Sequence, residues 1–163
     1  IGAIVADRAK GLRMNVSVHD PIVPADEIQK AGFESVSLEE LFSKSDYITI
    51  HVPKIDATTN MLNKAAFDKM KKGVMIINCA RGGIVNESDL YDAITSGQVS
   101  GAALDVFEKE PPGDNKLFEL DRVVCTPHLG ASTAEAQTNV AVMVAEQIVE
   151  YLKNGNAINA VNA

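Results

Sequence analysis

Cysteine and basic residues are scarce in this sequence, and their scarcity narrows what the protein can be. Among 163 residues there are two cysteines, Cys79 and Cys125, which are too few for a disulfide framework. We therefore expect reduced thiols and a cytoplasmic location. Lys and Arg number 15 against 22 Asp and Glu, the net charge is -7, and no block of the chain is rich in basic residues. Because nucleic acids are bound through basic surfaces, we expect no nucleic-acid partner.

Long apolar runs and metal-ligand clusters are also missing. No apolar run approaches the ~20 residues that span a bilayer, so no membrane partner is expected. Cysteine and histidine do not occur at the spacings of a metal site, and we predict none. The segment Ile1 to Ala9 is apolar but lacks the basic start and cleavage site of a signal peptide. Since the first residue is Ile1 and not Met, we expect a fragment or a processed chain.

Strand and helix patterns alternate through most of the sequence. The hydrophobic content of 46% suits one globular domain. Short runs rich in apolar and β-branched residues predict strands, and their nearly continuous apolar character indicates burial on both faces of a parallel sheet. Strands that alternate with helices predict a doubly wound α/β fold with right-handed crossovers. The predicted strands are 16–19, 47–52, 74–77, 102–104 and 123–125.

Capping residues predict where the helices begin and end. The segment 37–40 has the Ser-x-x-Glu pattern of a capping box, which predicts a short helix. Asn86 is a suitable cap for a helix that stops at Gly97. The segment 132–135 is a second capping box and predicts a long helix to Lys153. Further helices are expected over 2–10 and from 65 to 70, the latter ending at Gly73.

Three residues with complementary chemistry lie just beyond predicted strands: Arg81, Glu110 and His128. In doubly wound folds, ligands bind at the carboxyl ends of the strands. A guanidinium can hold a carboxylate through two parallel hydrogen bonds. A carboxylate can set the tautomer and basicity of an imidazole, which moves a proton near neutral pH. These three residues are therefore predicted to form a catalytic site for a small oxyacid.

Asp20 ends the first predicted strand and indicates a dinucleotide cofactor. An acidic residue at the end of the second strand of a dinucleotide fold accepts hydrogen bonds from the adenosine ribose. A carboxylate there repels a 2′-phosphate, and no Arg follows it, which favours NAD over NADP. The alternative interpretation is an ordinary turn aspartate before Pro21.

The glycine-rich fingerprint of such a fold is incomplete, because no full G-x-G-x-x-G occurs. Gly2 fits the third glycine of a fingerprint that would begin before residue 1. In that case the sheet lacks its first strand and most of the loop that cradles the pyrophosphate. Alternatively, Gly2 is a helix-packing glycine in a complete small domain.

Several motifs together resemble those of the D-isomer-specific 2-hydroxyacid dehydrogenases. They run through nearly the whole chain in the order and spacing of that family, which makes the resemblance more specific than a single pattern. The motifs are His-Val-Pro at 51–53, Asn-Cys-Ala-Arg-Gly-Gly-Ile-Val at 78–85, Ala-Leu-Asp-Val-Phe at 103–107, Glu-Pro-Pro at 110–112 and Pro-His-Leu-Gly-Ala-Ser-Thr at 127–133.

The resemblance implies an NAD-dependent oxidoreductase with a His/Glu acid-base pair. Arg81 would bind the substrate carboxylate, His128 would take the C2 hydroxyl proton, and Glu110 would raise the pKa of His128. Asp105 would lie near the nicotinamide carboxamide. Val52 stands where relatives carry Thr. A backbone contact to the cofactor would survive this change, but a hydrogen bond from the side chain would not. The residues that the resemblance places at the cofactor are Ile1, Asp20, Val52, Thr58, Cys79, Ala80, Arg81, Asp105, His128, Gly130 and Ala131.

The resemblance also implies a domain plan and a partner. Residues 1–153 would be the nucleotide-binding domain, and 154–163 a linker returning to a substrate domain outside this chain. The domain would associate into a homo-oligomer. The motif forms at 79–85 and 128–133 are most similar to the branch that oxidises 3-phospho-D-glycerate. Hydroxypyruvate, glyoxylate or another 2-keto acid remain alternatives, as does an NAD-sensing corepressor-like protein.

Other residues have plainer interpretations. His19 and His51 are expected to be structural histidines. Thr58 lies in a polar loop and fits a turn as well as a cofactor contact. Cys79 has no neighbouring base in any motif, so it is not expected to act as a nucleophile.

Overall fold

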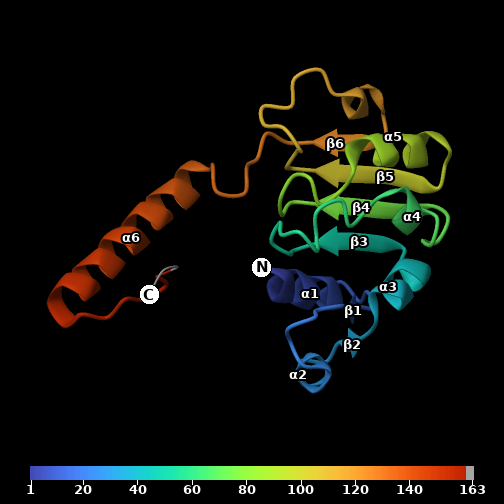
Figure 1. Cartoon of the computed structure of the whole chain (residues 1–163). Coiled ribbons are helices and arrows are strands. Elements are labelled where there is room, and N and C mark those ends of the chain that lie inside the picture. Colours follow the sequence, from blue (N-terminus) through green and yellow to red (C-terminus); the bar gives the residue numbers. More distant parts are fainter. Residues whose placement is uncertain (161–163) are drawn as a thin grey trace. The chain divides into compact units, whose positions relative to one another are not determined.

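The computed structural model describes residues 1–160 and confirms the parallel α/β fold (Figure 1). It divides into two compact units, Ile1–Pro127 and His128–Ala163. The helices are α1 (Gly2–Gly11), α2 (Ala25–Lys30), α3 (Leu38–Lys44), α4 (Lys64–Phe67), α5 (Glu87–Thr95), the 3₁₀ helix η1 (Lys116–Glu119) and α6 (Ala134–Asn154). The strands are β1 (Ser17–Val18), β2 (Glu34–Ser35), β3 (Tyr47–Ile50), β4 (Val74–Asn78), β5 (Val99–Leu104) and β6 (Val123–Cys125).

The strands form two parallel sheets where the sequence predicted one. β1 pairs with β2, and the larger sheet has the order β3-β4-β5-β6 (Figure 1). The sheets stay separate because no described strand pairs with both β1 and β3. In the larger sheet, Ile50 pairs with Asn78, Asn78 with Leu104, and Leu104 with Cys125. The carboxyl ends of these strands are therefore aligned at one edge.

The larger sheet is buried on one face and exposed on the other. Ile48, Ile76 and Leu104 point to the same face and are at most 5% exposed. They share a hydrophobic cluster with residues of α4 and α5. On the opposite face, Tyr47 is 55% and Val124 is 65% exposed. The prediction of strands buried on both faces is therefore wrong, because α4 and α5 both cover the same face.

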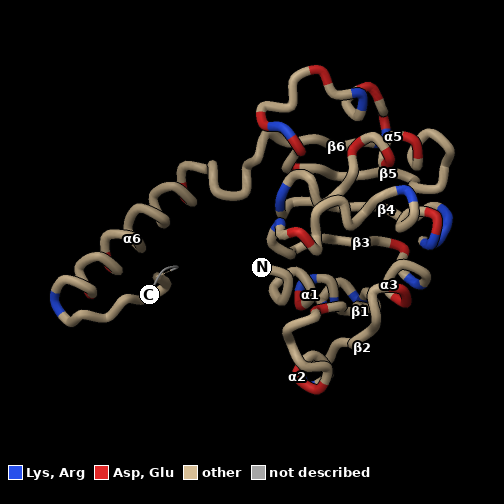
Figure 2. The backbone as a smooth tube through the Cα atoms, in the orientation of Figure 1, with Lys and Arg blue, Asp and Glu red and all other residues tan. Residues whose placement is uncertain are grey.

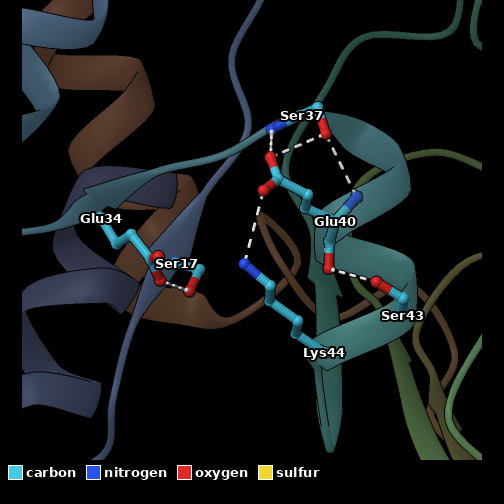
Figure 3. A network of polar contacts seen from close by, with 6 residues as sticks. All are labelled: Ser17, Glu34, Ser37, Glu40, Ser43 and Lys44. Atoms are coloured by element: carbon cyan, nitrogen blue, oxygen red, sulfur yellow. Dashed lines mark hydrogen bonds and ion pairs between the residues drawn. The ribbon is translucent and has the colours of Figure 1, made fainter.

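Side-chain caps start α3 and α5 where the sequence predicts. Ser37 Oγ accepts a hydrogen bond from the Glu40 backbone N–H, and Glu40 Oε2 accepts one from the Ser37 backbone N–H (Figure 3). This reciprocal pair is the predicted capping box. Asn86 Oδ1 accepts from the Asp89 backbone N–H at 2.9 Å and caps α5.

The start of α6 differs from the prediction by one residue. Thr133 is the cap, since its Oγ1 accepts from the Ala136 backbone N–H at 3.1 Å. Ser132, the expected cap of a capping box, instead donates its hydroxyl proton to the His128 carbonyl at 2.9 Å. The capping-box prediction at 132–135 is therefore wrong, although the helix itself is confirmed.

Three short elements were not predicted: α2, β2 and η1. α2 follows Pro24 and has no side-chain cap, so only the acidic Asp26 and Glu27 of its first turn mark its start. β2 has two residues, too few for a period to be read. The 3₁₀ helix η1 is capped by Asn115, whose Oδ1 accepts a hydrogen bond from the Leu117 backbone N–H. α4 is shorter than predicted and ends at Phe67.

The second unit consists mainly of α6, which ends at the predicted stop. Gly155 adopts a left-handed conformation with φ of 74°, which suits a residue without Cβ. No residue of α6 is buried, and its apolar stripe is exposed, with Val144 at 48% and Leu152 at 76%. The assignment of 1–153 to one domain and of 154–163 to a linker stays a prediction; residues 161–163 lie outside the described part.

Candidate active site

A cavity opens at the carboxyl ends of β3 and β4. Its volume is about 270 Å³. Side chains from the segment after β3 and from the turn after β4 meet there because the two strands end in register. Sequence segments that are distant in the chain, and that were predicted to contact a cofactor, are thus brought together. The lining residues are Ile1, His51, Val52, Pro53, Cys79, Ala80 and Arg81.

The start of α1 packs tightly against the end of β3. A Cβ built on Gly2 would lie 3.3 Å from His51 Cβ, so a larger residue would push the helix away from the strand. Close helix–strand packing is the role of the third glycine in a dinucleotide fingerprint. It is equally the role of an ordinary packing glycine, so both interpretations of Gly2 stand.

Asn78 shapes the turn that presents Arg81, a role that the sequence did not reveal. Its side chain is 2% exposed. Asn78 Nδ2 donates to the Arg81 carbonyl at 3.1 Å, and Oδ1 accepts from the Ala80 backbone N–H at 3.1 Å. The guanidinium of Arg81 is exposed and donates from Nη1 to the Ala80 carbonyl at 2.7 Å. A polar residue ending a buried strand was the signal that could have identified Asn78.

Glu110 lies in the loop that follows β5, and its carboxylate folds back on that loop. Oε1 accepts from the Phe107 backbone N–H at 3.0 Å. Phe107 is buried and meets Phe118 edge to face, with ring centroids 5.5 Å apart. The Glu110–Pro111 peptide bond is cis. The aromatic pair and the hydrogen bond from Phe107 to Glu110 therefore anchor this loop.

Asp105 lies at the end of β5 and is 6% exposed. Its Oδ1 accepts a hydrogen bond from Thr126 Oγ1 at 2.5 Å, and its backbone N–H donates to the Asn78 carbonyl at 3.0 Å. Burial raises the pKa of the Cys79 thiol, and the charge of Asp105 raises it further. Cys79 therefore stays a thiol at neutral pH, in agreement with the expectation that it is not a nucleophile.

Asp20 lies at the carboxyl end of β1 with one oxygen already engaged. Oδ1 accepts from the backbone N–H groups of Ile22 and Val23, at 2.8 Å and 3.1 Å. These hydrogen bonds lower the pKa of the Asp20 carboxyl, which keeps it ionised. The arrangement fixes the carboxylate, so Asp20 serves as a turn residue and can also present Oδ2 to a hydroxyl group.

Thr58 and His51 have polar partners that bear on their predicted roles. Thr58 Oγ1 donates to the Pro53 carbonyl at 2.7 Å and accepts from the Ile55 backbone N–H at 2.9 Å. This supports the turn interpretation of Thr58. His51 was expected to be structural, yet it lines the cavity and its Nε2 lies 3.0 Å from Thr49 Oγ1. A structural role is compatible with this position, and that interpretation of His51 stays a prediction.

The remaining predicted residues, His128, Gly130 and Ala131, belong to the second unit. His128 follows β6 closely and has a left-handed backbone with φ of 56°. Its pairing with Glu110 stays a prediction, because the two residues lie in different units. The same holds for the cofactor contacts of Gly130 and Ala131.

Other surfaces carry fewer signs of a binding site. A larger hollow of about 580 Å³ lies at the far end of α1, lined by Asp7, Arg8, Lys10, Gly11 and Leu12, and contains none of the predicted site residues. Basic and acidic residues are scattered along the described chain (Figure 2). Within residues 1–160, no group of three His, Cys, Asp or Glu side chains is placed to hold a metal ion. None of the described helices is both long and apolar enough to cross a membrane.

The cavity suits part of a dinucleotide. Its volume lies just below the ~300–1,000 Å³ range of small-molecule pockets. Val52 and Ala80 provide apolar walls, and Arg81 provides a cation. Outside the cavity lining, Asp20 lies just beyond β1 of the smaller sheet. Apolar walls with a few polar groups are what a nicotinamide dinucleotide requires.

Comparison with known proteins agrees with this geometry. The family described as D-isomer specific 2-hydroxyacid dehydrogenase, NAD binding domain, matches residues 1–130. The chain belongs to this family, and NAD as the cofactor is confirmed at the level of the family.

Among curated proteins, the chain is similar to D-3-phosphoglycerate dehydrogenases. It is 50% identical over 163 residues to that of Archaeoglobus fulgidus, which covers 99% of this chain and 31% of the relative. It is 48% identical over 162 residues to that of Bacillus subtilis, and this match covers 99% of this chain and 31% of the relative. The chain thus spans about a third of the length of these relatives.

Solved structures give the same fold. A glyoxylate reductase from Paecilomyes thermophila aligns with a TM-score of 0.90 at 31% identity, covering 99% of this chain and 49% of that one. A D-lactate dehydrogenase from Aquifex aeolicus, solved with NAD and lactic acid, aligns with a TM-score of 0.82 at 31% identity, covering 94% and 50%.

Proposed function

We propose that the protein carrying this chain oxidises 3-phospho-D-glycerate to 3-phosphohydroxypyruvate with NAD, the first step of phosphorylated serine biosynthesis. The observation that carries the proposal is Arg81 at the rim of the cavity, presented by the buried Asn78. The identity of about half the residues with D-3-phosphoglycerate dehydrogenases supports the choice of acid.

In this proposal, Arg81 holds the substrate carboxylate through two charge-assisted hydrogen bonds and polarises the C2 oxygen. His128 accepts the C2 hydroxyl proton, and Glu110 stabilises the imidazolium that forms. NAD, when bound, would supply the acceptor for the hydride of C2. The C2–H bond breaks, the C2–O bond becomes a carbonyl, and the released proton resides on His128.

The chain's own residues would orient the cofactor. Asp20 would present Oδ2 to the adenosine ribose, since Oδ1 already accepts hydrogen bonds within its own turn. Asp105, which accepts a hydrogen bond from Thr126, would lie near the carboxamide. By the family resemblance, further cofactor contacts would come from Ile1, Val52, Thr58, Cys79, Ala80, Gly130 and Ala131.

The proposal includes an arrangement of domains and a setting. Residues 1–153 act as the nucleotide-binding domain, 154–163 as a linker, and the domain associates into a homo-oligomer, as the family resemblance implies. A cytoplasmic location is consistent with two free cysteines, Cys79 and Cys125. Light scattering after size-exclusion chromatography of the full-length protein tests the assembly, and a monomer at working concentration would contradict it.

The mechanism is tested by replacing His128 in the full-length protein. His128→Ala should lower turnover at least ~100-fold, the scale of losing a general acid-base group. Gln137→Ala, an exposed position of α6, is the control and should keep normal turnover. Near-normal turnover of the His128 variant would refute the mechanism.

The substrate is tested separately in the reductive direction, with NADH and a panel of four 2-keto acids: 3-phosphohydroxypyruvate, hydroxypyruvate, glyoxylate and pyruvate. The highest kcat/KM is expected for the phosphorylated acid. A clear preference for an unphosphorylated acid would overturn this choice while keeping the reaction class. Assembly driven by NAD without turnover of any acid would indicate a dinucleotide sensor instead.

A further inference from the structure

Glu87, the first residue of α5, uses both carboxylate oxygens to hold the loop that carries Glu110. Oε1 accepts a hydrogen bond from the Glu108 backbone N–H at 2.5 Å. Oε2 accepts one from Asn115 Nδ2 at 2.7 Å. The partners lie 21 and 28 residues away in the chain, at the two ends of the loop segment 108–115. One side chain thus fastens both ends of the segment that contains Glu110.

Glu87 also lies at the end of the segment between β4 and α5, which contains Arg81. Arg81 and Glu87 are joined by the short segment between β4 and α5. Gly82 in this segment lies against the Phe107 backbone, where a built Cβ would come within 1.7 Å of the carbonyl oxygen. The segment with Arg81 and the loop with Glu110 are therefore joined at two points, once by backbone contact and once by Glu87.

The charge of Glu87 suits this task. The position at the start of α5 places the carboxylate where the helix dipole favours a negative charge. A carboxylate that accepts from an N–H and an amide forms stronger hydrogen bonds than a neutral acceptor. Burial raises the pKa of the Cys125 thiol, and the charge of Glu87 raises it further. The negative charge of Glu87 therefore also acts on the end of β6, where Cys125 lies.

We infer that Glu87 is a positioning residue for the dehydrogenase reaction. It keeps the loop with Glu110 at a fixed place relative to the segment with Arg81 and touches neither substrate nor cofactor. The inference rests on the proposed function, which assigns Arg81 and Glu110 to catalysis. A displacement of about 1 Å in a catalytic group can lower a rate ~100-fold, so a loop held at both ends is a requirement of such a site.

The neighbouring Asn115 allows the hydrogen bond to be broken and then restored. In Glu87→Gln, the new amide keeps an acceptor for the Glu108 N–H but turns an NH₂ group toward the NH₂ group of Asn115. Asn115→Asp alone places two carboxylates against each other. In the double variant, the new amide at position 87 donates to the new carboxylate at position 115, which reverses donor and acceptor. Aspartate also suits position 115 as the cap of η1.

The experiment uses the full-length protein and measures kcat, KM for NAD, and amide hydrogen exchange of residues 106–115. Each single variant should lower kcat about ten- to a hundredfold, leave KM for NAD within about twofold, and speed exchange in the loop. The double variant should recover most of both losses, as expected for two groups that interact directly. Asp92→Asn, an exposed carboxylate on the same helix, controls for the loss of one charge and should resemble the wild type.

The outcomes separate this inference from the proposed function. A wild-type protein without dehydrogenase activity refutes the function, while hydrogen exchange still tests whether Glu87 holds the loop. Wild-type activity with unchanged exchange in both single variants overturns the inference. So does faster exchange without a fall in kcat, and so does a double variant no better than the singles. If Glu87→Gln does not fold, Asn115→Asp and the double variant supply the same comparison.

Discussion

The α-carbon of Gly82 lies against the carbonyl of Phe107, and no side chain fits between them. A Cβ built on Gly82 would come within 1.7 Å of the Phe107 oxygen and 2.9 Å of the Glu108 nitrogen. Both neighbours are backbone atoms, so rotation of a flexible side chain cannot relieve the overlap. The residue after Arg81 is therefore a glycine because the two candidate catalytic segments touch there.

Gly82→Ala should displace these segments from each other. We expect kcat/KM of the full-length protein to fall at least ~100-fold, because both Arg81 and Glu110 move. The free energy of unfolding should fall by about 1–3 kcal/mol, the usual cost of overpacking. Steady-state kinetics and chemical denaturation measure the two effects. Gly11→Ala is the matched control, since no atom lies within 4 Å of its built Cβ, and a comparable loss in that variant would refute the explanation.

Arg81→Lys tests whether geometry or charge matters at the rim of the cavity. Lysine keeps the positive charge but lacks the planar fork that binds a carboxylate through two hydrogen bonds. We expect kcat/KM for the acid to fall about ten- to a hundredfold, the worth of one hydrogen bond to a charged group. Arg8→Lys, at an exposed ion pair in α1, should have no effect. Unchanged kcat/KM in the Arg81 variant would show that a point charge suffices.

Local patterns in the sequence predicted those parts of the fold that depend on near neighbours. The capping box at Ser37 and the cap at Asn86 need partners only three residues away, and both were predicted correctly. The position of Arg81 beyond a strand was also predictable, because a parallel sheet aligns its carboxyl ends. These features require no knowledge of distant contacts.

Other features depend on partners far along the chain and left no local pattern. Glu87 resembles any acidic residue in the first turn of a helix until its bond to Glu108 is seen. Burial of one sheet face follows from where α4 and α5 pack, which periodicity within a strand does not determine. Ser132 and Thr133 are adjacent hydroxyl residues, and either could cap α6. Because Ser132 donates its hydroxyl proton to the His128 carbonyl, Thr133 is the cap.

Asp20→Asn should weaken NAD binding and reduce its preference over NADP. The amide oxygen can still accept from the Ile22 N–H, so the turn is preserved, while the negative charge is lost. We expect the Kd for NAD to rise about tenfold, since a hydrogen bond to a charged group becomes neutral. The Kd for NADP should change less. The lost hydrogen bond weakens its binding, but removing the Asp20 charge also removes the repulsion of the 2′-phosphate. Calorimetric titration of the full-length protein measures both. Asp26→Asn is the control, and equal affinities in all three proteins would exclude Asp20 from the site.

His51 should make stability depend on pH in a defined direction. Burial lowers the pKa of His51 below its ordinary value of 6.5, because the imidazolium loses hydration at the cavity wall. As the pH falls below 6.5, the unfolded chain takes up a proton at this histidine before the folded chain does. The contribution of neutral His51 to the free energy of unfolding is therefore fully present above pH 6.5. It is lost as the pH falls from there to the lowered pKa of the folded state.

His51→Gln removes this proton uptake and should flatten part of the pH dependence. The melting temperature of the full-length protein, measured at several pH values from neutral to mildly acidic, should decline less in the variant than in the wild type. His19→Gln is the control for removing a histidine outside the cavity, and it should leave the His51 contribution in place. The same decline in wild type and His51→Gln would show that burial of this imidazole does not disfavour its charged form.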